Sequence, residues 1–303
     1  MPKIFKTNAE IATCGGKLLK LTHDSKETGT QMDVNIYLPK QYYDKSKKEC
    51  HESKIPTLYY LSGLTCTPNN ASEKAFWQLQ ADKYGFTVVF PDTSPRGGDE
   101  VPDDKNDWSF GKGAGFYLNA TEPKYAANYR MYDYVHKELP SLLQQEFGSD
   151  GKLDFIKNKS ITGHSMGGYG AISGFLKNYG AYKSCSAFAP ICNPSVVGWG
   201  IKCFSNYLGS DNKAAWKQYD PCDLVKVVKS TNASDKVLIH VGTKDPFLNE
   251  HLRPELLLNA SKGTTWEGKF DINLVDNFDH SYYFISTFVP EHAEFHAKHL
   301  GLL

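Results

Sequence analysis

The sequence lacks several features that mark whole classes of protein. Its 34 Lys and Arg residues balance 34 Asp and Glu residues, so the net charge is zero. Non-specific binding of nucleic acid needs excess positive charge and is not expected. No stretch approaches the roughly 18 apolar residues of a membrane span. The opening residues, MPKIFKTNAEIATCGG, contain no apolar core of a signal peptide. We therefore expect a cytoplasmic protein with neither nucleic acid nor a membrane as its partner.

Cysteines in the pattern of a disulfide framework or a zinc site are also missing. The seven cysteines are an odd number, and no pair has zinc-knuckle spacing. We interpret them as reduced thiols, most of them small core residues. Because the sequence also has no histidine-rich ligand cluster, we predict an enzyme or binding protein with no metal and no cofactor.

The sequence does contain enough apolar material for a large core. It has 17 Phe, 18 Tyr and 5 Trp residues among 303, which excludes disorder as the main state. It shows no internal repeat, no low-complexity segment and no linker rich in Pro, Gly or Ser. We therefore predict a single domain over residues 1–303.

Apolar runs alternate with helical patterns along the chain, which predicts an α/β fold around a mostly parallel sheet flanked by helices. Two alternating runs near the start predict an antiparallel beginning to that sheet. A helix is predicted over 73–84, with Phe76 and Leu79 on one face. The polar stretch 40–54 and the glycine-rich stretch 93–121 are predicted loops. The predicted strands lie within 17–25, 31–39, 57–64, 86–92, 158–165, 184–190, 236–245 and 269–275, and the other predicted helices within 125–147, 166–178 and 281–299.

The strongest chemical signal is Gly163-His164-Ser165-Met166-Gly167, a G-x-S-x-G match between a predicted strand and a predicted helix. Such a turn strains the backbone at the serine and leaves no room for side chains two residues away, which explains Gly163 and Gly167. The turn also brings the Met166 N–H to the positive end of a helix, where it can stabilise an oxyanion. Ser165 is therefore the predicted nucleophile.

The acid that assists Ser165 is sought downstream, because α/β-hydrolases place Ser, Asp or Glu, and His in that order. Asp245 follows a buried strand and so lies at the carboxyl edge of the sheet, where active sites of such folds are found. The rival acids follow no such strand; they are Asp220, Asp223, Asp276 and Asp279. Asp245 is the predicted acid.

A base is required as well, since an ordinary hydroxyl is a poor nucleophile. His280 lies in NFDHSYYF, between the predicted strand at 269–275 and the last helix, and is the predicted base. His240 lies inside a strand and His164 inside the turn, so both are expected to pack. The remaining downstream histidines are rivals, of which the last three are expected to face solvent; they are His251, His292, His296 and His299.

A second oxyanion donor is expected after the strand that ends in LSGL at 61–64. Gly63 allows close backbone approach, and the N–H of Leu64 is the candidate donor. Cys66 would then lie near the active site. It is either a thiol of lowered pKa, sensitive to oxidants, or an inert buried thiol; no catalytic role is expected because Ser165 supplies the nucleophile.

Seven motifs in the same order resemble the S-formylglutathione hydrolase, or esterase D, family. They are LSGLTCTPNNASEKAFWQ, FPDTSPRG, GAGFYLNAT, ITGHSMGGYGA, SAFAPICNP, HVGTKDPFL and FDHSYYFISTFVPEHAEFHA. The resemblance implies an α/β-hydrolase fold and a serine thioesterase that cleaves the glutathione thioester S-formylglutathione to formate and glutathione, in formaldehyde detoxification. By the family pattern Ser165 is the nucleophile, Asp245 the orienting acid and His280 the base, and Leu64 and Met166 donate the oxyanion N–H groups.

The resemblance does not settle which residues bind the acyl group and the glutathione part of the substrate. The segment near Trp199 resembles the wall of the family's site, and Trp108 and Phe110 are further candidates for a narrow acyl side. Arg96 and Lys112 are candidates for binding the carboxylates of glutathione. The family often forms homodimers. The alternatives are a general carboxylesterase acting on small acyl esters, an acyltransferase, and a catalytically silent binding protein on the same fold.

Overall fold

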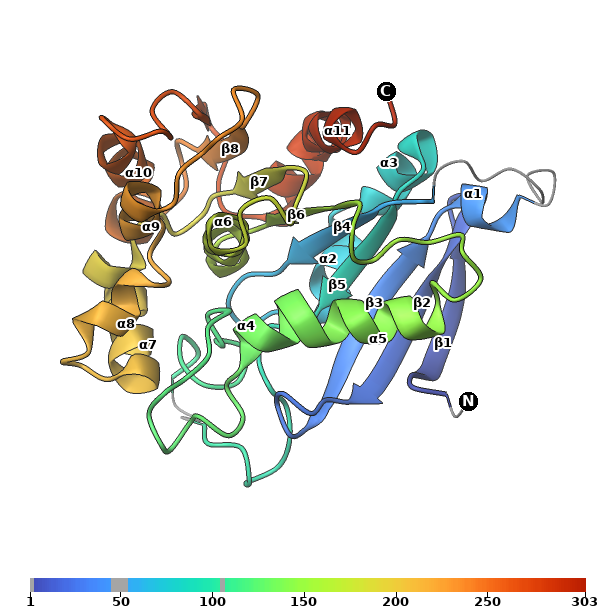
Figure 1. Cartoon of the computed structure of the whole chain (residues 1–303), viewed down its shortest axis with the longest axis horizontal. Helices are drawn as coiled ribbons and strands as arrows, with labels where there is room; N and C mark the ends of the chain where they lie inside the picture. Colours follow the sequence, from blue (N-terminus) through green and yellow to red (C-terminus); the bar gives the residue numbers. More distant parts are fainter. Residues whose placement is uncertain (1–2, 45–53, 104–106) are drawn as a thin grey trace.

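The computed structural model describes residues 3–44, 54–103 and 107–303. Within these ranges, nine strands form one sheet in the order β1-β2-β3-β5-β4-β6-β7-β8-β9 (Figure 1). The strands are β1 (Lys6–Thr13), β2 (Gly16–Asp24), β3 (Gln31–Leu38), β4 (Thr57–Leu61), β5 (Thr87–Pro91), β6 (Lys159–Gly163), β7 (Cys185–Phe188), β8 (Val237–Gly242) and β9 (Phe270–Val275).

Helices occupy the intervals between most of these strands. The longest is α11, which follows the last strand. The α-helices are α1 (Lys40–Tyr43), α2 (Pro68–Lys74), α3 (Trp77–Tyr84), α4 (Met131–Asp133), α5 (Leu139–Glu146), α6 (Met166–Lys177), α7 (Gly198–Leu208), α8 (Lys213–Lys217), α9 (Pro221–Val227), α10 (Pro254–Ser261) and α11 (Tyr282–His299). Short helical turns of other types are η2 (Tyr134–Glu138), η3 (Pro194–Val196) and η4 (Leu248–Leu252).

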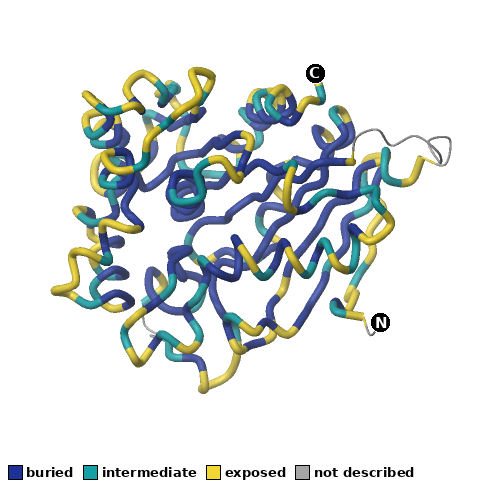
Figure 2. Tube along the Cα trace, in the orientation of Figure 1, coloured by how far each residue is buried: buried dark blue, intermediate teal, exposed yellow. Residues whose placement is uncertain are grey.

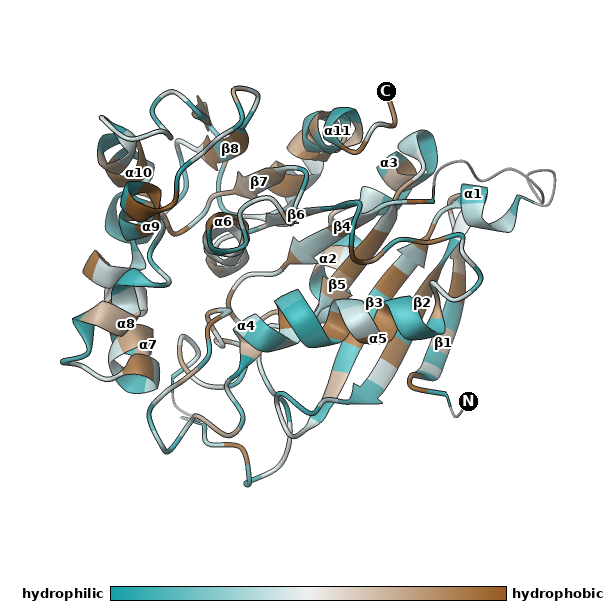
Figure 3. Cartoon of the chain, viewed as in Figure 1, coloured by the Kyte–Doolittle hydropathy of each residue, from teal (hydrophilic) through white to brown (hydrophobic). Residues whose placement is uncertain are grey.

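The sheet confirms the predicted α/β class. The pairs β1–β2, β2–β3 and β3–β5 are antiparallel. The pairs β5–β4, β4–β6, β6–β7, β7–β8 and β8–β9 are parallel. The parallel strands β4 to β8 are buried along their whole length (Figure 2), and Figure 3 shows apolar residues in β5 and β8. A strand covered on both faces is typically a continuous apolar run, which is why β4, β5, β7 and β8 could be recognised. Strand β6 is buried as well, but it carries Ile161 among polar residues.

Helices cover both faces of the sheet. On one face α11 packs against α3, β7 and β8; on the other, α6 packs against β4, β6 and β7 and against α9 (Figure 1). The carboxyl ends of the parallel strands therefore open between two helical layers. The predicted site residues lie at this edge, after β4, β6, β8 and β9.

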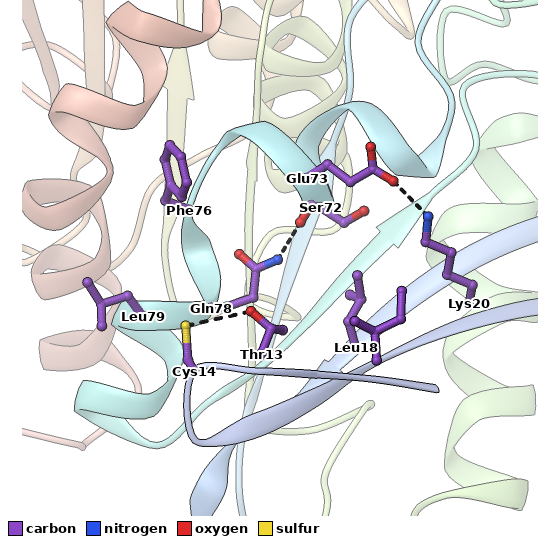
Figure 4. A pocket seen from close by; sticks show the side chains of 10 residues that line it. Thr13, Cys14, Leu18, Lys20, Ser72, Glu73, Phe76, Gln78 and Leu79 are labelled. Carbon is purple, nitrogen blue, oxygen red and sulfur yellow. Dashed lines mark hydrogen bonds and ion pairs between the residues drawn. The ribbon is translucent and has the colours of Figure 1, made fainter. Parts of the chain in front are cut away.

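The predicted helix over 73–84 is wrong in its boundaries and in the face it buries. Two helices, α2 and α3, meet at Phe76, whose backbone is left-handed with φ 59°. Phe76 and Leu79 are 63% and 61% exposed, while Trp77 beside them is fully buried. The two exposed side chains border a groove of about 410 Å³ against the β1–β2 hairpin (Figure 4). The kink at Phe76 rotates α3 so that Trp77 takes the core position.

Other differences are local. Strand β1 was not predicted, because its residues are mostly exposed and polar. The helical region predicted over 125–147 begins at Met131 and passes through the π-turn η2 just before Pro140, which has no N–H to continue an α-helix. Within the described parts of 93–121 the chain forms no helix or strand, as predicted. Of the predicted loop at 40–54, residues 45–53 lie outside the described residues, and Lys40–Tyr43 form α1.

Candidate active site

Ser165 occupies a strained turn between β6 and α6, as the G-x-S-x-G motif predicts. Its backbone angles are φ 58° and ψ −119°, a combination that residues other than glycine rarely adopt. A Cβ on Gly163 would lie 2.2 Å from the carbonyl oxygen of Gly167, and one on Gly167 would lie 2.0 Å from that of Leu61. Both glycines are therefore required by the packing of the turn. The Ser165 N–H donates to the carbonyl of Phe188 at 2.9 Å, which ties the turn to β7.

Two further glycines lie in the first turns of α6. A Cβ on Gly168 would lie 3.0 Å from Pro190 and 3.3 Å from the carbonyl oxygen of Gly163, at the end of β6, and one on Gly170 would lie 2.5 Å from the ring of Tyr117. Gly168 thus lets α6 approach the sheet, and Gly170 makes room for a residue of the 93–121 segment. The consequence is that the 93–121 segment, through Tyr117, packs directly on the helix behind Ser165.

Asp245 and His280 meet at the carboxyl edge of the sheet, although 35 residues separate them. The backbone brings them together: Gly242 lies so close to the carbonyl of Phe278 that a Cβ would approach its oxygen to 2.2 Å. His280 Nδ1 lies 2.5 Å from Asp245 Oδ2, and the Asp245 side chain is fully buried while that of His280 is 16% exposed. Asp245 Oδ1 accepts the N–H of Phe247 at 2.9 Å, which orients the carboxylate.

Ser165 and His280 line one cavity of about 150 Å³. Within the described chain, the Ser165 hydroxyl makes no hydrogen bond, and in free enzymes the serine–histidine contact is often loose. The other residues that line the cavity come from the loops after β4, β5, β6 and β8 and from α7 and α11. The full set is Gly63, Leu64, Cys66, Trp108, His164, Ser165, Trp199, Phe247, His280 and Tyr282.

The loop after β4 lies against the turn that carries Ser165. A Cβ on Gly63 would be 3.2 Å from that of Ser165. The loop is fixed from outside: Thr65 N–H donates to the carbonyl of Gly113 at 2.9 Å, and the Tyr117 hydroxyl donates to the Ser62 carbonyl at 2.8 Å.

Two backbone N–H groups are free beside this loop. Among the residues that the structure describes, neither the Leu64 N–H nor the Met166 N–H has a hydrogen-bond partner. Both groups belong to the predicted oxyanion hole, and Leu64 lines the cavity. Two unpaired donors beside Ser165 can stabilise negative charge that develops on a carbonyl oxygen.

The aromatic wall is made by two tryptophans. Trp199 stacks on His251 with ring centres 3.7 Å apart, and Trp108 meets Trp199 edge-on at 5.4 Å. Trp108 is 56% exposed. Phe110 is not part of this wall, because it is buried against Tyr207, away from the cavity. Phe247 and Tyr282 line the cavity without having been predicted; each stands two residues after a predicted site residue, which was the available signal.

Cys66 lies at the cavity as predicted, but not as an activated thiol. Burial raises its pKa, against the smaller opposing influence of Lys74 and Arg96. Its sulfur lies 4.0 Å from the Tyr282 hydroxyl. The structure therefore favours the inert buried thiol over the oxidant-sensitive one.

The two cations proposed for carboxylate binding are already engaged. Arg96 donates to both oxygens of the buried Asp92 and to the carbonyl of Cys66, so it fixes the loop after β4. Lys112 donates to the carbonyls of Gly97 and Gly98. Most of the donors of both side chains are therefore used within the protein.

The rival acids have other tasks. Asp220 accepts the N–H groups of Ser195 and Cys222 and caps α9. Asp279 accepts from Ser281 at the start of α11, and Asp223 pairs with Lys226.

The rival histidines partly contradict their predicted exposure. His240 and His164 are buried, as predicted, but His292 and His296 are fully buried rather than facing solvent. Their nitrogens bind serine hydroxyls of β7. That burial could not be seen from the helical pattern, because the serines belong to a distant strand.

No group of three or more His, Cys, Asp or Glu residues that could hold a metal ion is found in the described chain. Nor does a described helix have the length and apolar character to cross a membrane.

Comparisons with known proteins agree with this geometry. The model of a family described as a putative esterase matches residues 25–295. The chain is 61% identical to the S-formylglutathione hydrolase of Saccharomyces cerevisiae over 99% of this chain and 100% of the yeast protein. It is 45% identical to that of Mus musculus over 95% and 96% of the two chains. The structure of an S-formylglutathione hydrolase from Agrobacterium tumefaciens superposes with a TM-score of 0.87, at 42% identity, over 98% of this chain and 100% of that one.

Proposed function

The chain belongs to the S-formylglutathione hydrolase family of esterases, and from this premise we propose that it hydrolyses S-formylglutathione through Ser165, His280 and Asp245. One observation carries the proposal. A buried carboxylate holds one nitrogen of His280 at 2.5 Å, and the ring lines the same cavity as the strained serine. Such a pairing supports the cationic form that a histidine base passes through.

Acylation follows from the positions of these groups. With its Nδ1–H donated to Asp245, His280 has Nε2 free to accept the Ser165 proton as the hydroxyl oxygen attacks the formyl carbon. The N–H groups of Leu64 and Met166 stabilise the oxyanion. The C–S bond then breaks, and the glutathione sulfur leaves with the proton that His280 held.

Deacylation repeats these steps with water. Water attacks the formyl ester on Ser165 and gives a proton to His280; the C–O bond to Ser165 breaks, Ser165 regains its proton, and formate leaves. Losing one oxyanion donor typically costs about 2.7–4 kcal/mol in the barrier. Formate and glutathione are the two products, which fits a role in formaldehyde detoxification.

The cavity size supports a small acyl group. Its volume of about 150 Å³ is below the roughly 300–1,000 Å³ of pockets that enclose drug-sized ligands. The formyl group and the adjoining sulfur fit inside, whereas the rest of a tripeptide has to lie along the rim.

Lys74 is the cation that we assign to a glutathione carboxylate at this rim. Its Nζ lies 6.0 Å from the ring centre of Tyr282, which lines the cavity. In contrast with Arg96, it forms no ion pair with any described carboxylate. An exposed ammonium at the end of α2 can therefore bind a carboxylate without breaking an existing bond.

Hydrolysis of S-formylglutathione, followed by loss of the thioester absorbance, tests the function. Wild-type protein and Ser165→Ala are compared, with p-nitrophenyl acetate as a second substrate. We expect thioester hydrolysis that Ser165→Ala abolishes. Activity on the aryl ester alone would instead favour the general carboxylesterase, and silence on both substrates would favour the binding protein.

The organisation of the protein beyond this site is proposed on the family resemblance. We propose a single domain over 1–303, a cytoplasmic location and a homodimer. Light scattering from the purified full chain tests the homodimer, for which a mass near 33.9 kDa would be the contrary result.

A further inference from the structure

A chain of buried hydrogen bonds lies beneath the nucleophile turn, and the mechanism above does not use it. His240 Nδ1 lies 3.0 Å from His292 Nε2, and His292 Nδ1 lies 2.8 Å from Ser186 Oγ. Ser186 Oγ also lies 2.8 Å from His296 Nε2 and 2.8 Å from Thr162 Oγ1. All five side chains are buried. We refer to His240, His292 and His296 as the buried histidine chain.

The two ends of this chain differ. At the surface, His240 Nε2 lies 3.5 Å from a carboxylate oxygen of Glu291, whose side chain is 58% exposed. Inside the protein, His296 Nδ1 lies 2.8 Å from Ser184 Oγ, which in turn lies 2.7 Å from Ser160 Oγ. The chain thus runs from solvent into the sheet through α11, β8, β7 and β6.

The pattern of partners allows two directions of donation. Burial lowers the pKa of all three histidines, so each is neutral near pH 7 and has one N–H donor and one acceptor nitrogen. His240 and His292 are bonded directly, so the tautomer of one fixes that of the other. With both protons on Nε2, Ser186 gives its one proton to His292 and must accept from Nε2–H of His296, so all three protons lie on Nε2. With both protons on Nδ1, Ser186 accepts from His292 and can donate to His296, whose proton then lies on Nδ1, or to Thr162.

The first direction satisfies every bond. Ser186 donates to Nδ1 of His292 and accepts from Nε2–H of His296 and from the Thr162 hydroxyl. Ser184 donates to Nδ1 of His296 and accepts from the hydroxyl of Ser160. The reverse direction satisfies the interior equally well, and so the interior alone does not select between them.

The surface end makes the selection. A carboxylate has no proton to donate, so an Nε2–H on His240 attracts Glu291, whereas a bare Nε2 would set two acceptors against each other. We propose that Glu291 is a positioning residue that holds the buried histidine chain in the Nε2–H tautomers and so orients the hydroxyls of β6 and β7 beneath Ser165.

The hydroxyls matter because they lie within the pairing of β6 with β7 that leads to the turn. Ile161 pairs with Cys185 and His164 with Phe188, and the Thr162–Ser186 bond lies between these two pairs. The Ser160–Ser184 bond lies on the other side of Ile161 and Cys185. These side-chain bonds therefore add to the backbone contacts that hold β6 beside β7.

The chain also reaches Ser165 through a ring. His292 stacks on Phe188 at 3.8 Å between ring centres, and the carbonyl of Phe188 accepts the Ser165 N–H at 2.9 Å. A change in the direction of donation thus acts on both strands that hold the nucleophile turn.

The tautomers can be measured directly in the full-length protein. Long-range proton–nitrogen correlation spectra of ¹⁵N-histidine-labelled protein distinguish Nε2–H from Nδ1–H. We expect Nε2–H at all three positions of the wild type. In Glu291→Lys, an ammonium that donates to His240 Nε2 reverses the chain, and we expect Nδ1–H at His240 and His292. Glu294→Lys makes the same charge change on an exposed residue of the same helix and serves as the matched control, with wild-type tautomers.

Kinetics test the positioning role. We expect kcat for p-nitrophenyl acetate to fall at least about threefold in Glu291→Lys, because a misplaced nucleophile reacts more slowly, with KM unchanged. Glu294→Lys should leave both constants unchanged. Nδ1–H tautomers in the wild type, unchanged tautomers in Glu291→Lys, or an unchanged kcat after reversal would each overturn the proposal. The kinetic measurement rests on the proposed function; a wild type without esterase activity refutes that function, and the spectra still decide the tautomers.

Discussion

Two sets of histidines differ in what faces them: His280, which follows β9, and the buried histidine chain of β8 and α11. His280 has a buried carboxylate on one nitrogen and the cavity on the other side. The buried histidine chain has hydroxyls and neighbouring rings, with Glu291 only at its surface end. A carboxylate stabilises the cation that a base becomes during turnover, whereas hydroxyls satisfy a neutral ring. The comparison teaches that the partner of a histidine, more than its burial, separates a base from a structural element.

Replacing Asp245 with Asn breaks the comparison at its catalytic side and has the largest expected effect. The amide no longer stabilises the imidazolium or fixes its tautomer, and we expect kcat for S-formylglutathione to fall about 10⁴-fold with the fold retained. Asp279→Asn is the matched control, because that carboxylate binds Ser281 next to His280 rather than the ring. An Asp245→Asn enzyme within tenfold of the wild type would refute the assigned role.

His296→Ala tests the buried histidine chain, the structural half of the comparison. It removes partners from the hydroxyls of Ser184 and Ser186 and opens a cavity in the core, so we expect a loss of about 2–5 kcal/mol in the free energy of unfolding. Urea titration measures it. His299→Ala, on the same helix with its ring half-buried, should change stability by about 0.5 kcal/mol or less; equal losses in the two variants would contradict the distinction.

Mild acid should lower the free energy of unfolding through the buried histidines. Burial lowers the pKa of His296 and of His136 to about 3, below the 6.5 of the unfolded chain, so the unfolded state binds more protons between these values. Stability is therefore complete above pH 6.5 and is lost as the pH falls, by up to about 1.4 kcal/mol per pH unit for each such histidine.

Urea midpoints at pH 7.5, 6 and 5 measure this effect above the usual pKa range of carboxylates. The His296→Ala variant should show a shallower decline than the wild type, since one of the responsible groups is gone. A wild-type midpoint that does not change from pH 7.5 to 5 would contradict the expectation.

The smallest expected effect concerns a charged group that lies in solvent. Lys74→Gln should raise KM for S-formylglutathione about two- to fivefold, because an exposed ion pair contributes little. The KM for neutral p-nitrophenyl acetate should stay the same. Lys83→Gln, another exposed lysine beside a tyrosine, is the control, and the same KM for the thioester in both variants would remove Lys74 from the rim.

Much of the fold and site could be predicted because the signals were local. Apolar runs mark β4, β5, β7 and β8, and the crowding around Ser165 requires glycine at 163 and 167. Asp245 and His280 were predicted from chain order and strand ends, and the structure brings them into contact; their catalytic roles stay predictions.

What could not be predicted depends on contacts in the folded chain. The predicted helix has Phe76 and Leu79 on one face, but Trp77 takes the buried position because the backbone is left-handed at Phe76. His292 and His296 were expected to face solvent, because a helical pattern shows spacing and not the serines of a distant segment that contact them. Arg96 binds Asp92, and that contact depends on the shape of an irregular loop. Periodicity along one element encodes none of these contacts.

The crowding around Ser165 also has an evolutionary consequence. Side chains at 163 or 167 would collide with backbone atoms, and no rotamer change relieves such a collision. Proteins that descend from this sequence are therefore expected to keep glycine at both positions. Trp108 is largely exposed and Trp199 packs mainly on rings, so mutations there meet fewer steric barriers. Substitutions are thus expected to accumulate in the aromatic wall formed by Trp108 and Trp199 rather than in the turn. New acyl preferences can then arise while the reaction itself stays the same.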